Sequence, residues 1–293
     1  MDDSSGAAAG SARRPISGCV ITFNESDRID ACLDSLAFCD ELLVVDSNST
    51  DDTRERALAR RARVLTRPFD DFRRQKNYTV QQARHDWILF INADERVTPE
   101  LRVAIEAERD RGFPGAAAYR FRRRNDYFGR FLEHGNASPD RVTRLFDRGK
   151  GRIDGGRVHE SVRTLGTVRR LAGALEHFPY RSFDEHVDRV HRYARAMAEH
   201  DHERGRRATL LDVVLRPWWR FLRGYVIRLG FLDGWRGLIY AYVRIVYVRE
   251  KYMRLWLLNR GYRVSRQDRA IGGHPADVRP ARARRHGTRR RSV

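Results

Sequence analysis

A chain of 293 residues, 41% of them hydrophobic, can bury a sizeable core, and this composition excludes a wholly disordered protein. The formal net charge of +19 is carried almost entirely by arginine, which indicates partners that bear phosphate: a phosphorylated substrate, anionic lipid or nucleic acid. The three cysteines fit neither a disulfide framework nor a zinc site, so we expect them to be small buried side chains.

Residues 1–15 are rich in alanine, serine and glycine, and we expect them to be disordered. Asp2 and Asp3 stand where a signal peptide carries positive charge, and no apolar run follows them. The sequence therefore predicts a cytoplasmic protein.

Between Ile16 and about Leu101, short apolar runs alternate with amphipathic stretches, as they do in β-α-β units. The expected strands are residues 16–23, 41–46, 63–67 and 87–92. Helices are expected between them, the first capped by Ser26, and a further helix begins at Thr98. This pattern predicts a parallel sheet covered on both faces, with ligands bound beyond the carboxyl ends of its strands.

After about residue 116 the pattern becomes irregular and rich in arginine and glycine. Short strand-like pieces are expected at residues 117–121, 142–146 and 168–171, followed by a polar helix at residues 183–203. We interpret residues 16–115 and 116–205 as the two halves of one domain.

Residues 206–258 are dense in aromatic and aliphatic side chains, but charges interrupt every apolar run before it reaches the roughly 18 to 20 residues of a spanning helix. Pro217-Trp218-Trp219 is flanked by Arg216, Arg220 and Arg223 on one helical face. Aromatic rings beside arginines suit the headgroup layer of an anionic membrane, so we predict a membrane-surface helical segment. The alternative is a helical hairpin packed on the preceding domain.

Residues 259–293 hold eleven arginines against two aspartates and show no apolar periodicity, and we expect a disordered basic tail. Charge alone supports a non-enzymatic, basic nucleic-acid-binding protein. No helix-turn-helix, zinc-finger or RNA-binding signature accompanies the charge, which disfavours nucleic acid as the partner.

The acidic cluster Asn92-Ala93-Asp94-Glu95 follows an apolar strand and precedes a helix. Two carboxylates at a strand end can hold Mg²⁺ or Mn²⁺ against a diphosphate, because hard cations take oxygen ligands. The alternative is that Asp94 and Glu95 only favour the start of the following helix electrostatically.

Asp46 ends the second apolar run and is followed by short polar residues that can form a turn and cap the next helix. Its carboxylate can accept hydrogen bonds from a nucleobase or ribose. Capping does not explain Asp46, which must have a partner if it is buried.

Four motifs in order resemble family 2 glycosyltransferases, and in particular the branch of lipopolysaccharide inner-core glucosyltransferases: ITFNE at 21–25, VVDSNSTDDT at 44–53, QKN at 75–77 and WILFINADE at 87–95. The resemblance covers about residues 16–258. It implies an α/β, A-type glycosyltransferase fold, Rossmann-like, with a C-terminal amphipathic helical segment. Residues 16–115 would then be the nucleotide-sugar-binding half and residues 116–205 the acceptor-side half.

The resemblance also implies roles for single residues. The residues implied to lie around the nucleotide are Thr22, Asn24, Glu25, Asp46, which would bind the base, and Lys76. Asp94 would be the second acid of the D-x-D motif and the metal ligand, whereas Asn92 replaces the first acid. An amide can still accept from ribose or reach metal through water.

Val158-His159-Glu160, followed by His177, resembles the V-H-E element of the same branch. An inverting transfer needs a base for the acceptor hydroxyl, and Glu160 is the candidate, because a metal-bound carboxylate such as Asp94 is a poor base. His159 would complete the metal shell or bind the diphosphate. It could equally be a hydrogen-bonded structural residue.

The function implied is an inverting hexosyltransferase that moves glucose or another hexose from a UDP-sugar to a lipopolysaccharide-core or other lipid-linked saccharide. It would be peripheral on the inner face of the plasma membrane. The rival enzyme class, a nucleotidyltransferase, usually shows a Gly-rich loop and a basic residue after its first strand, and residues 23–26 provide neither.

Overall fold

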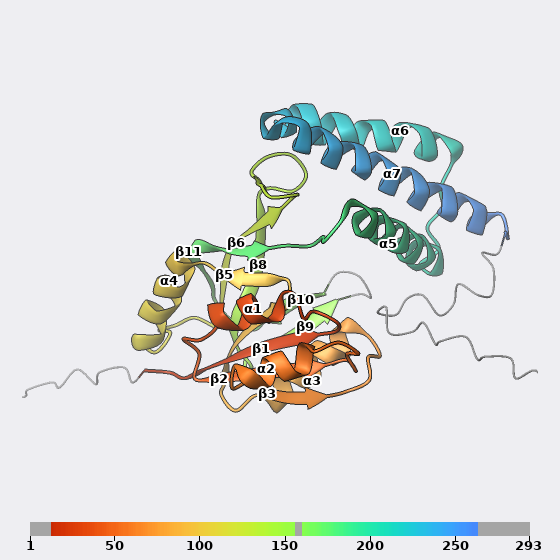
Figure 1. Cartoon of the computed structure of the whole chain (residues 1–293). Helices are drawn as coiled ribbons and strands as arrows, with labels where there is room; N and C mark the ends of the chain where they lie inside the picture. Colours follow the sequence, from red (N-terminus) through yellow and green to blue (C-terminus); the bar gives the residue numbers. More distant parts are fainter. Residues whose placement is uncertain (1–12, 156–159, 263–293) are drawn as a thin grey trace, which may run out of the picture.

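The computed structural model describes residues 13–155 and 160–262, except for the side chain of Glu160 (Figure 1). The strands are β1 (Ile16–Thr22), β2 (Glu41–Asp46), β3 (Arg63–Thr66), β4 (Trp87–Asn92), β5 (Glu95–Val97), β6 (Ala118–Asp126), β7 (Phe131–Leu132), β8 (Asp140–Asp147), β9 (Gly151–Gly155), β10 (Glu160–Thr164) and β11 (Val168–His177). The helices are α1 (Ile29–Ser35), α2 (Thr53–Ala59), α3 (Phe72–Gln82), α4 (Pro99–Asp110), α5 (Phe183–Glu203), α6 (Leu210–Phe221), the π-helix η1 (Leu222–Ile227), the 3₁₀-helix η2 (Gly230–Asp233) and α7 (Gly234–Asn259).

The main sheet of the described chain has the order β3-β2-β1-β4-β8-β6-β11-β5, with β7 paired to β6. Strands β3, β2, β1 and β4 run parallel, whereas β8 is antiparallel to both of its neighbours. Strands β9 and β10 form a separate two-stranded sheet. The expected α/β fold, with a parallel first half and a mixed second half, is confirmed.

Helices cover both faces of the parallel half, which explains why its strands are continuously apolar. Every residue of β1 is buried, and successive side chains face opposite sides of the sheet. Val20 belongs to the same core cluster as Ile29 of α1. Cys19 belongs to the cluster that contains Val80 of α3.

Helix α1 begins later than the sequence suggests. Ser26, the expected cap, lies ahead of the helix, and Arg28 occupies the N-cap position without a side-chain hydrogen bond. The amide of Ser26 instead donates to Asp51 of the β2–α2 loop at 3.2 Å, so a contact between two loops replaces the local cap. Thr98 caps α4 as expected, accepting from the amide of Leu101.

The C-terminal helices pack against one another: α5 contacts α7, and α7 contacts α6 (Figure 1). Within the residues that the structure describes, none of these helices has the length and apolarity required for a membrane span. Asn259, expected to open the tail, is the last residue of α7, and its side chain accepts from the amide of Ala208 at 2.9 Å. The ordered chain therefore extends beyond the expected boundary.

Helix α5 is fixed to the domain by an aromatic cluster around His186. The ring of His186 stacks on Tyr180 with centroids 4.0 Å apart, and its Nδ1 lies 3.2 Å from the hydroxyl of Tyr127 in β6–β7. Burial, followed by the charges of Arg189 and Arg244, lowers the pKa of His186 to about 4.

We therefore expect acid to loosen the C-terminal helices. Because the folded pKa of His186 lies below the unfolded value of about 6.5, its stabilising effect is complete above that pH and is lost as the pH falls toward 4. Between pH 7 and pH 5 the free energy of unfolding should fall by about 2 kcal/mol more in the wild type than in His186→Gln. Urea titrations at both pH values measure this difference, with the exposed His191→Gln as control. Equal pH dependence in wild type and His186→Gln would contradict the assignment.

Candidate active site at the strand ends

Three adjacent strands of the parallel half end in polar residues. In the pairing register, Thr22 of β1 is opposite Asp46 of β2, and Ile21 of β1 is opposite Asn92 of β4. Asp94 follows Asn92 by two residues. The sheet therefore brings four of the predicted site residues to one edge, where parallel sheets bind ligands.

Three buried oxygens at this edge have no hydrogen-bond partner in the described part of the chain: Thr22 Oγ1, Asn92 Oδ1 and Asp94 Oδ1. A buried polar atom without a partner costs about 1 to 3 kcal/mol, and native proteins contain few of them. Because all three lie on neighbouring strand ends, we interpret them as ligand-binding atoms.

Asp94 is paired with His177, the last residue of β11. Asp94 Oδ2 lies 3.3 Å from His177 Nε2, and His177 Nδ1 lies 2.7 Å from the side-chain oxygen of Asn125. Asn125 donates its own amide to Ala137 and Asp140, so the proton of the imidazole is assigned to Nδ1. The Nε2 atom faces Asp94 Oδ2, so its lone pair can coordinate a cation placed beside that carboxylate.

Positive charge surrounds the Asp94 carboxylate. Burial alone would raise its pKa, but His177, Arg189 and Arg28 more than offset burial, and the pKa of Asp94 lies well below its usual range. Asp94 is therefore ionised at neutral pH, as a metal ligand must be.

Glu95 does not face the same way as Asp94, contrary to the expectation that both carboxylates emerge together. Its side chain is fully buried and binds Arg144 at 2.9 Å and Arg123 at 3.1 Å. The other carboxylate oxygen accepts from the amide of Asn92 at 2.9 Å. Glu95 thus holds the end of β4 in place from the interior of the domain. Its carboxylate is not available as a second metal ligand or as a base.

Glu95→Gln should lower the free energy of unfolding by about 1 to 3 kcal/mol, because Arg144 would lose its carboxylate partner, whereas Arg123 keeps Asp140. Urea denaturation measures the loss. The matched control Glu106→Gln removes a partly exposed partner of Arg102 and should cost less than about 1 kcal/mol. Equal, small losses in both variants would show that Glu95 does not hold the strand end.

Asp46 is completely buried, and the partner that its burial requires is Ser49. The Ser49 amide donates to Asp46 Oδ2 at 2.8 Å, and the Ser49 hydroxyl donates to Oδ1. The Asp46 carboxylate therefore shapes the β2–α2 loop. Each of its oxygens retains a second lone pair for a ligand at the sheet edge.

The β1–α1 loop is joined to the β2–α2 loop through Asn24. Its backbone adopts the left-handed conformation (φ 52°), its amide donates to Ser49, and its side chain accepts from the amide of Thr50 at 2.8 Å. Glu25 follows and binds Arg181 at 2.6 Å. Burial, and then the charge of Asp94, raises the pKa of Glu25 to about 7.

Lys76, the remaining predicted nucleotide contact, lies on α3 and is buried. Its ammonium lies 5.6 Å from the ring centroid of Phe72 and 5.9 Å from that of Phe90 in β4. Its neighbour Gln75 reaches the β2 strand end, donating to the hydroxyl of Ser47 at 3.1 Å. Helix α3 is thus packed directly beside the sheet edge.

The family model of glycosyl transferase family 2 matches residues 17–171, which is more than half of the chain and includes the ends of β1, β2 and β4. This chain belongs to glycosyl transferase family 2.

The glycosyltransferase is 29% identical over 254 residues to the lipopolysaccharide core biosynthesis glycosyltransferase LpsC of Rhizobium meliloti, across 81% of this chain and 93% of LpsC. It is 27% identical over 257 residues to the uncharacterized glycosyltransferase RP128 of Rickettsia prowazekii, across 83% of this chain and 86% of the relative. Among solved structures, glucosyl-3-phosphoglycerate synthase of Mycobacterium tuberculosis aligns at 27% identity with a TM-score of 0.33, over 38% of this chain and 44% of that chain.

The family model and the similarity to LpsC confirm the A-type glycosyltransferase fold and the resemblance to the lipopolysaccharide-core branch. The family membership and the glycosyltransferase relatives show that this chain is an enzyme, a transferase. The two rival interpretations, a nucleotidyltransferase and a non-enzymatic nucleic-acid-binding protein, are therefore set aside.

Two predicted site residues of this glycosyltransferase cannot be placed. His159 and the side chain of Glu160 lie outside the described residues, although the backbone of Glu160 pairs with Gly155 between β10 and β9. Within the described ranges, no group of three or more His, Cys, Asp or Glu residues could hold a metal ion.

Sequence reasoning gave no role to three residues that the fold brings to the site: His177, Arg181 and Arg189. Arg181 precedes α5 and joins it to the β1–α1 loop by binding both Glu25 and Asp27. The arginines carry no sequence signal in a chain so rich in arginine. His177 did carry a sequence signal, because it follows the Val158-His159-Glu160 segment that resembles the V-H-E element.

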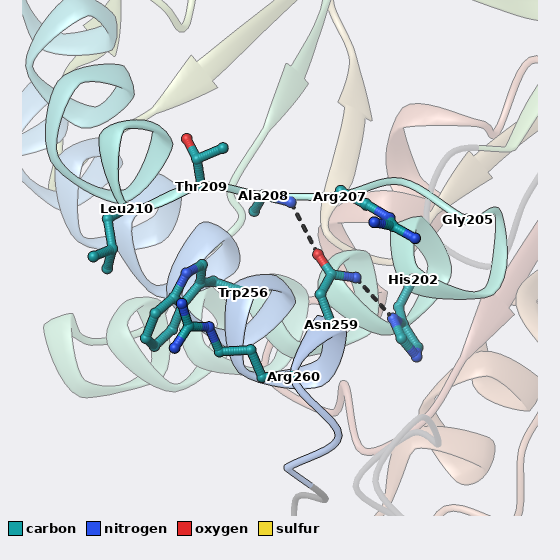
Figure 2. Close-up of a pocket in the computed structure, with 9 residues that line it drawn as sticks. All are labelled: His202, Gly205, Arg207, Ala208, Thr209, Leu210, Trp256, Asn259 and Arg260. Carbon is teal, nitrogen blue, oxygen red and sulfur yellow. Dashed lines mark hydrogen bonds between the residues drawn. The ribbon is translucent and has the colours of Figure 1, made fainter.

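One hollow of this glycosyltransferase lies away from the strand ends. It has a volume of about 630 Å³ and lies between the end of α5, the start of α6 and the end of α7 (Figure 2). Asn259 lines this hollow, and its side chain forms hydrogen bonds with the amide of Ala208 and with the ring of His202 (Figure 2). These bonds tie the three helices together, and none of the predicted site residues lines this hollow.

Proposed function

We propose that this glycosyltransferase moves a hexose, with glucose favoured, from a UDP-sugar to a lipopolysaccharide-core or other lipid-linked saccharide, with inversion at the anomeric carbon. The supporting observation is the set of unpartnered oxygens on Thr22, Asn92 and Asp94, because an enzyme of this family needs polar contacts for its donor at this edge. The acceptor class is supported by the similarity to LpsC along most of both chains.

Asp94 and His177 are the proposed ligands of a Mg²⁺ or Mn²⁺ ion, and His159 is a further candidate. The ionised carboxylate and the imidazole nitrogen oriented by Asn125 form a donor set that fits such a cation. A divalent cation at this position would neutralise the charge that develops on the leaving diphosphate.

The remaining residues of the sheet edge are proposed to bind the nucleotide. Asp46 would accept from the base with its unused lone pairs, and Asn92 would accept from a ribose hydroxyl. The other proposed contacts are Thr22, Asn24, Glu25 and Lys76.

Glu160 is the proposed general base, which would remove the proton of the acceptor hydroxyl as that oxygen attacks the anomeric carbon. Its backbone position in β10 places it in the second half of the domain, where the acceptor is proposed to bind. The proposed location of the enzyme is the inner face of the plasma membrane, as a peripheral protein.

A screen of nucleotide-sugars for thermal stabilisation tests the donor proposal. UDP-glucose with Mn²⁺ should raise the Tm of the protein more than UDP-glucose with a chelator, and more than GDP- or ADP-sugars with Mn²⁺. Transfer of labelled glucose to a truncated lipopolysaccharide core then tests the acceptor. A Tm that responds only to a different nucleotide would overturn the UDP assignment.

A further inference from the structure

Exposed apolar side chains of this protein are concentrated in one segment. Of the 23 large hydrophobic residues that the described structure leaves exposed, fifteen fall between Leu210 and Tyr242. This segment comprises α6, η1, η2 and the first turns of α7, and we call it the apolar elbow. A contiguous exposed apolar surface of this kind marks an interaction site.

The helical spacing of these residues puts them on one outward face. Along α6 and η1 the exposed residues include Leu211, Val214, Leu215, Trp218, Trp219, Leu222 and Val226, which repeat at intervals of three and four. The buried residues of the same helices are Pro217 and Gly224. A helix that only covered a soluble domain would turn its apolar stripe inward, whereas this helix turns it to the surroundings.

The elbow also carries uncompensated positive charge. It contains five arginines against Asp212 and Asp233, and Asp233 is buried. Arg223 and Arg228 are exposed and form no ion pair with the described residues. Arginines among tryptophans suit the boundary of an anionic leaflet, where rings enter the apolar layer and guanidinium groups bind lipid phosphates.

The elbow is rigidly joined to the catalytic domain through the hairpin of β6 and β7. The buried Asp233 carboxylate accepts from the amides of Glu133 and His134 at 3.2 and 3.0 Å. Gly224 permits close approach at the junction, since a Cβ on this residue would lie 1.9 Å from the side-chain amide nitrogen of Asn136. Because the elbow is joined to the domain by these contacts, a partner bound to the elbow would have a fixed orientation relative to the strand ends that form the candidate active site.

We propose that the apolar elbow embeds in the headgroup layer of an anionic phospholipid bilayer and lies in the plane of the membrane. The active site is thereby held at a fixed orientation to lipid-linked acceptors. The occupant is assigned as the bilayer because the exposed apolar residues lie beside Arg223 and Arg228, which have no ion-pair partner among the described residues and can bind lipid phosphates. This inference rests on the proposed function only for the lipid-linked nature of the acceptor.

Flotation of the full-length protein with phosphatidylglycerol-containing vesicles tests the proposal. The triple variant Trp218→Ser/Trp219→Ser/Leu222→Ser should lower the partition coefficient by at least about tenfold, since it removes three large apolar groups from the contact. The control Leu58→Ser/Val103→Ser changes side chains that are 58% and 65% exposed outside the elbow, and it should partition like the wild type. Tryptophan fluorescence should be quenched by lipids brominated on the acyl chains in the wild type.

Arg223→Gln/Arg228→Gln should weaken binding to anionic vesicles and leave binding to neutral vesicles unchanged, because only the charge attraction is removed. The proposal is overturned if the triple variant binds vesicles like the wild type. It is also overturned if neither protein binds and the triple variant converts a wild-type dimer to monomers, because a second copy would then cover the elbow. The response of the triple variant's Tm to UDP-glucose and Mn²⁺ tests the proposed function separately from membrane binding.

Discussion

Asp94→Asn should lower the kcat of hexose transfer by a factor on the order of 10² to 10³. The loss is expected because the variant removes the negative charge at the proposed metal position. The free energy of unfolding should also fall, because Asp94 pairs with His177 and its lowered pKa means that the folded protein favours the ionised carboxylate, so kcat is measured where the variant remains folded.

The matched control for Asp94 is Asp86→Asn, which changes an exposed aspartate just before β4 that pairs with Arg148. This control should transfer at the wild-type rate. His177→Gln should raise the Mn²⁺ concentration needed for half-maximal rate, which separates a metal ligand from a merely structural histidine. Near-normal turnover of Asp94→Asn at limiting Mn²⁺ would remove Asp94 from the mechanism.

Glu160→Gln should reduce the transfer rate by a factor on the order of 10² to 10⁴, because the neutral amide cannot accept the proton of the acceptor hydroxyl. The affinity for the donor should remain nearly constant, since a general base contributes in the transition state and not to nucleotide binding. Single-turnover kinetics with saturating donor, together with the donor-induced shift in Tm, measure the two quantities independently.

Glu55→Gln, an exposed substitution on α2, is the control for Glu160 and should leave both quantities unchanged. If Glu160→Gln retains full activity, the base is another residue. Glu95 is excluded as that residue by its burial against Arg123 and Arg144.

Local sequence was sufficient to predict the nucleotide-binding half. Strands β1, β2 and β4 are covered on both faces, so their apolar runs are continuous and readable without knowledge of any contact. The polar residues at their ends, including Asp46 and Asp94, follow from the same pattern because parallel strands end at one edge. Thr98 likewise caps α4 through an amide only three residues away.

Long-range contacts decided the rest of the site. Adjacent carboxylates at 94 and 95 look equivalent in the sequence, but Glu95 is turned inward by arginines of β6 and β8, and Asp94 is met by His177 from the end of β11. The two carboxylates point in different directions because their charged partners come from other strands of the sheet. No local sequence pattern shows which partners those strands will bring.

The sequence of α6 likewise determined that the helix has an apolar face, because the spacing of its hydrophobic residues is a local property. It did not determine whether that face is covered. Only the packing of α7 against α6, and the anchoring of Asp233 to the β6–β7 hairpin, leaves Trp218 and Trp219 exposed. An amphipathic pattern is the same whichever way the helix is turned, so the tertiary structure alone decides which face meets the surroundings.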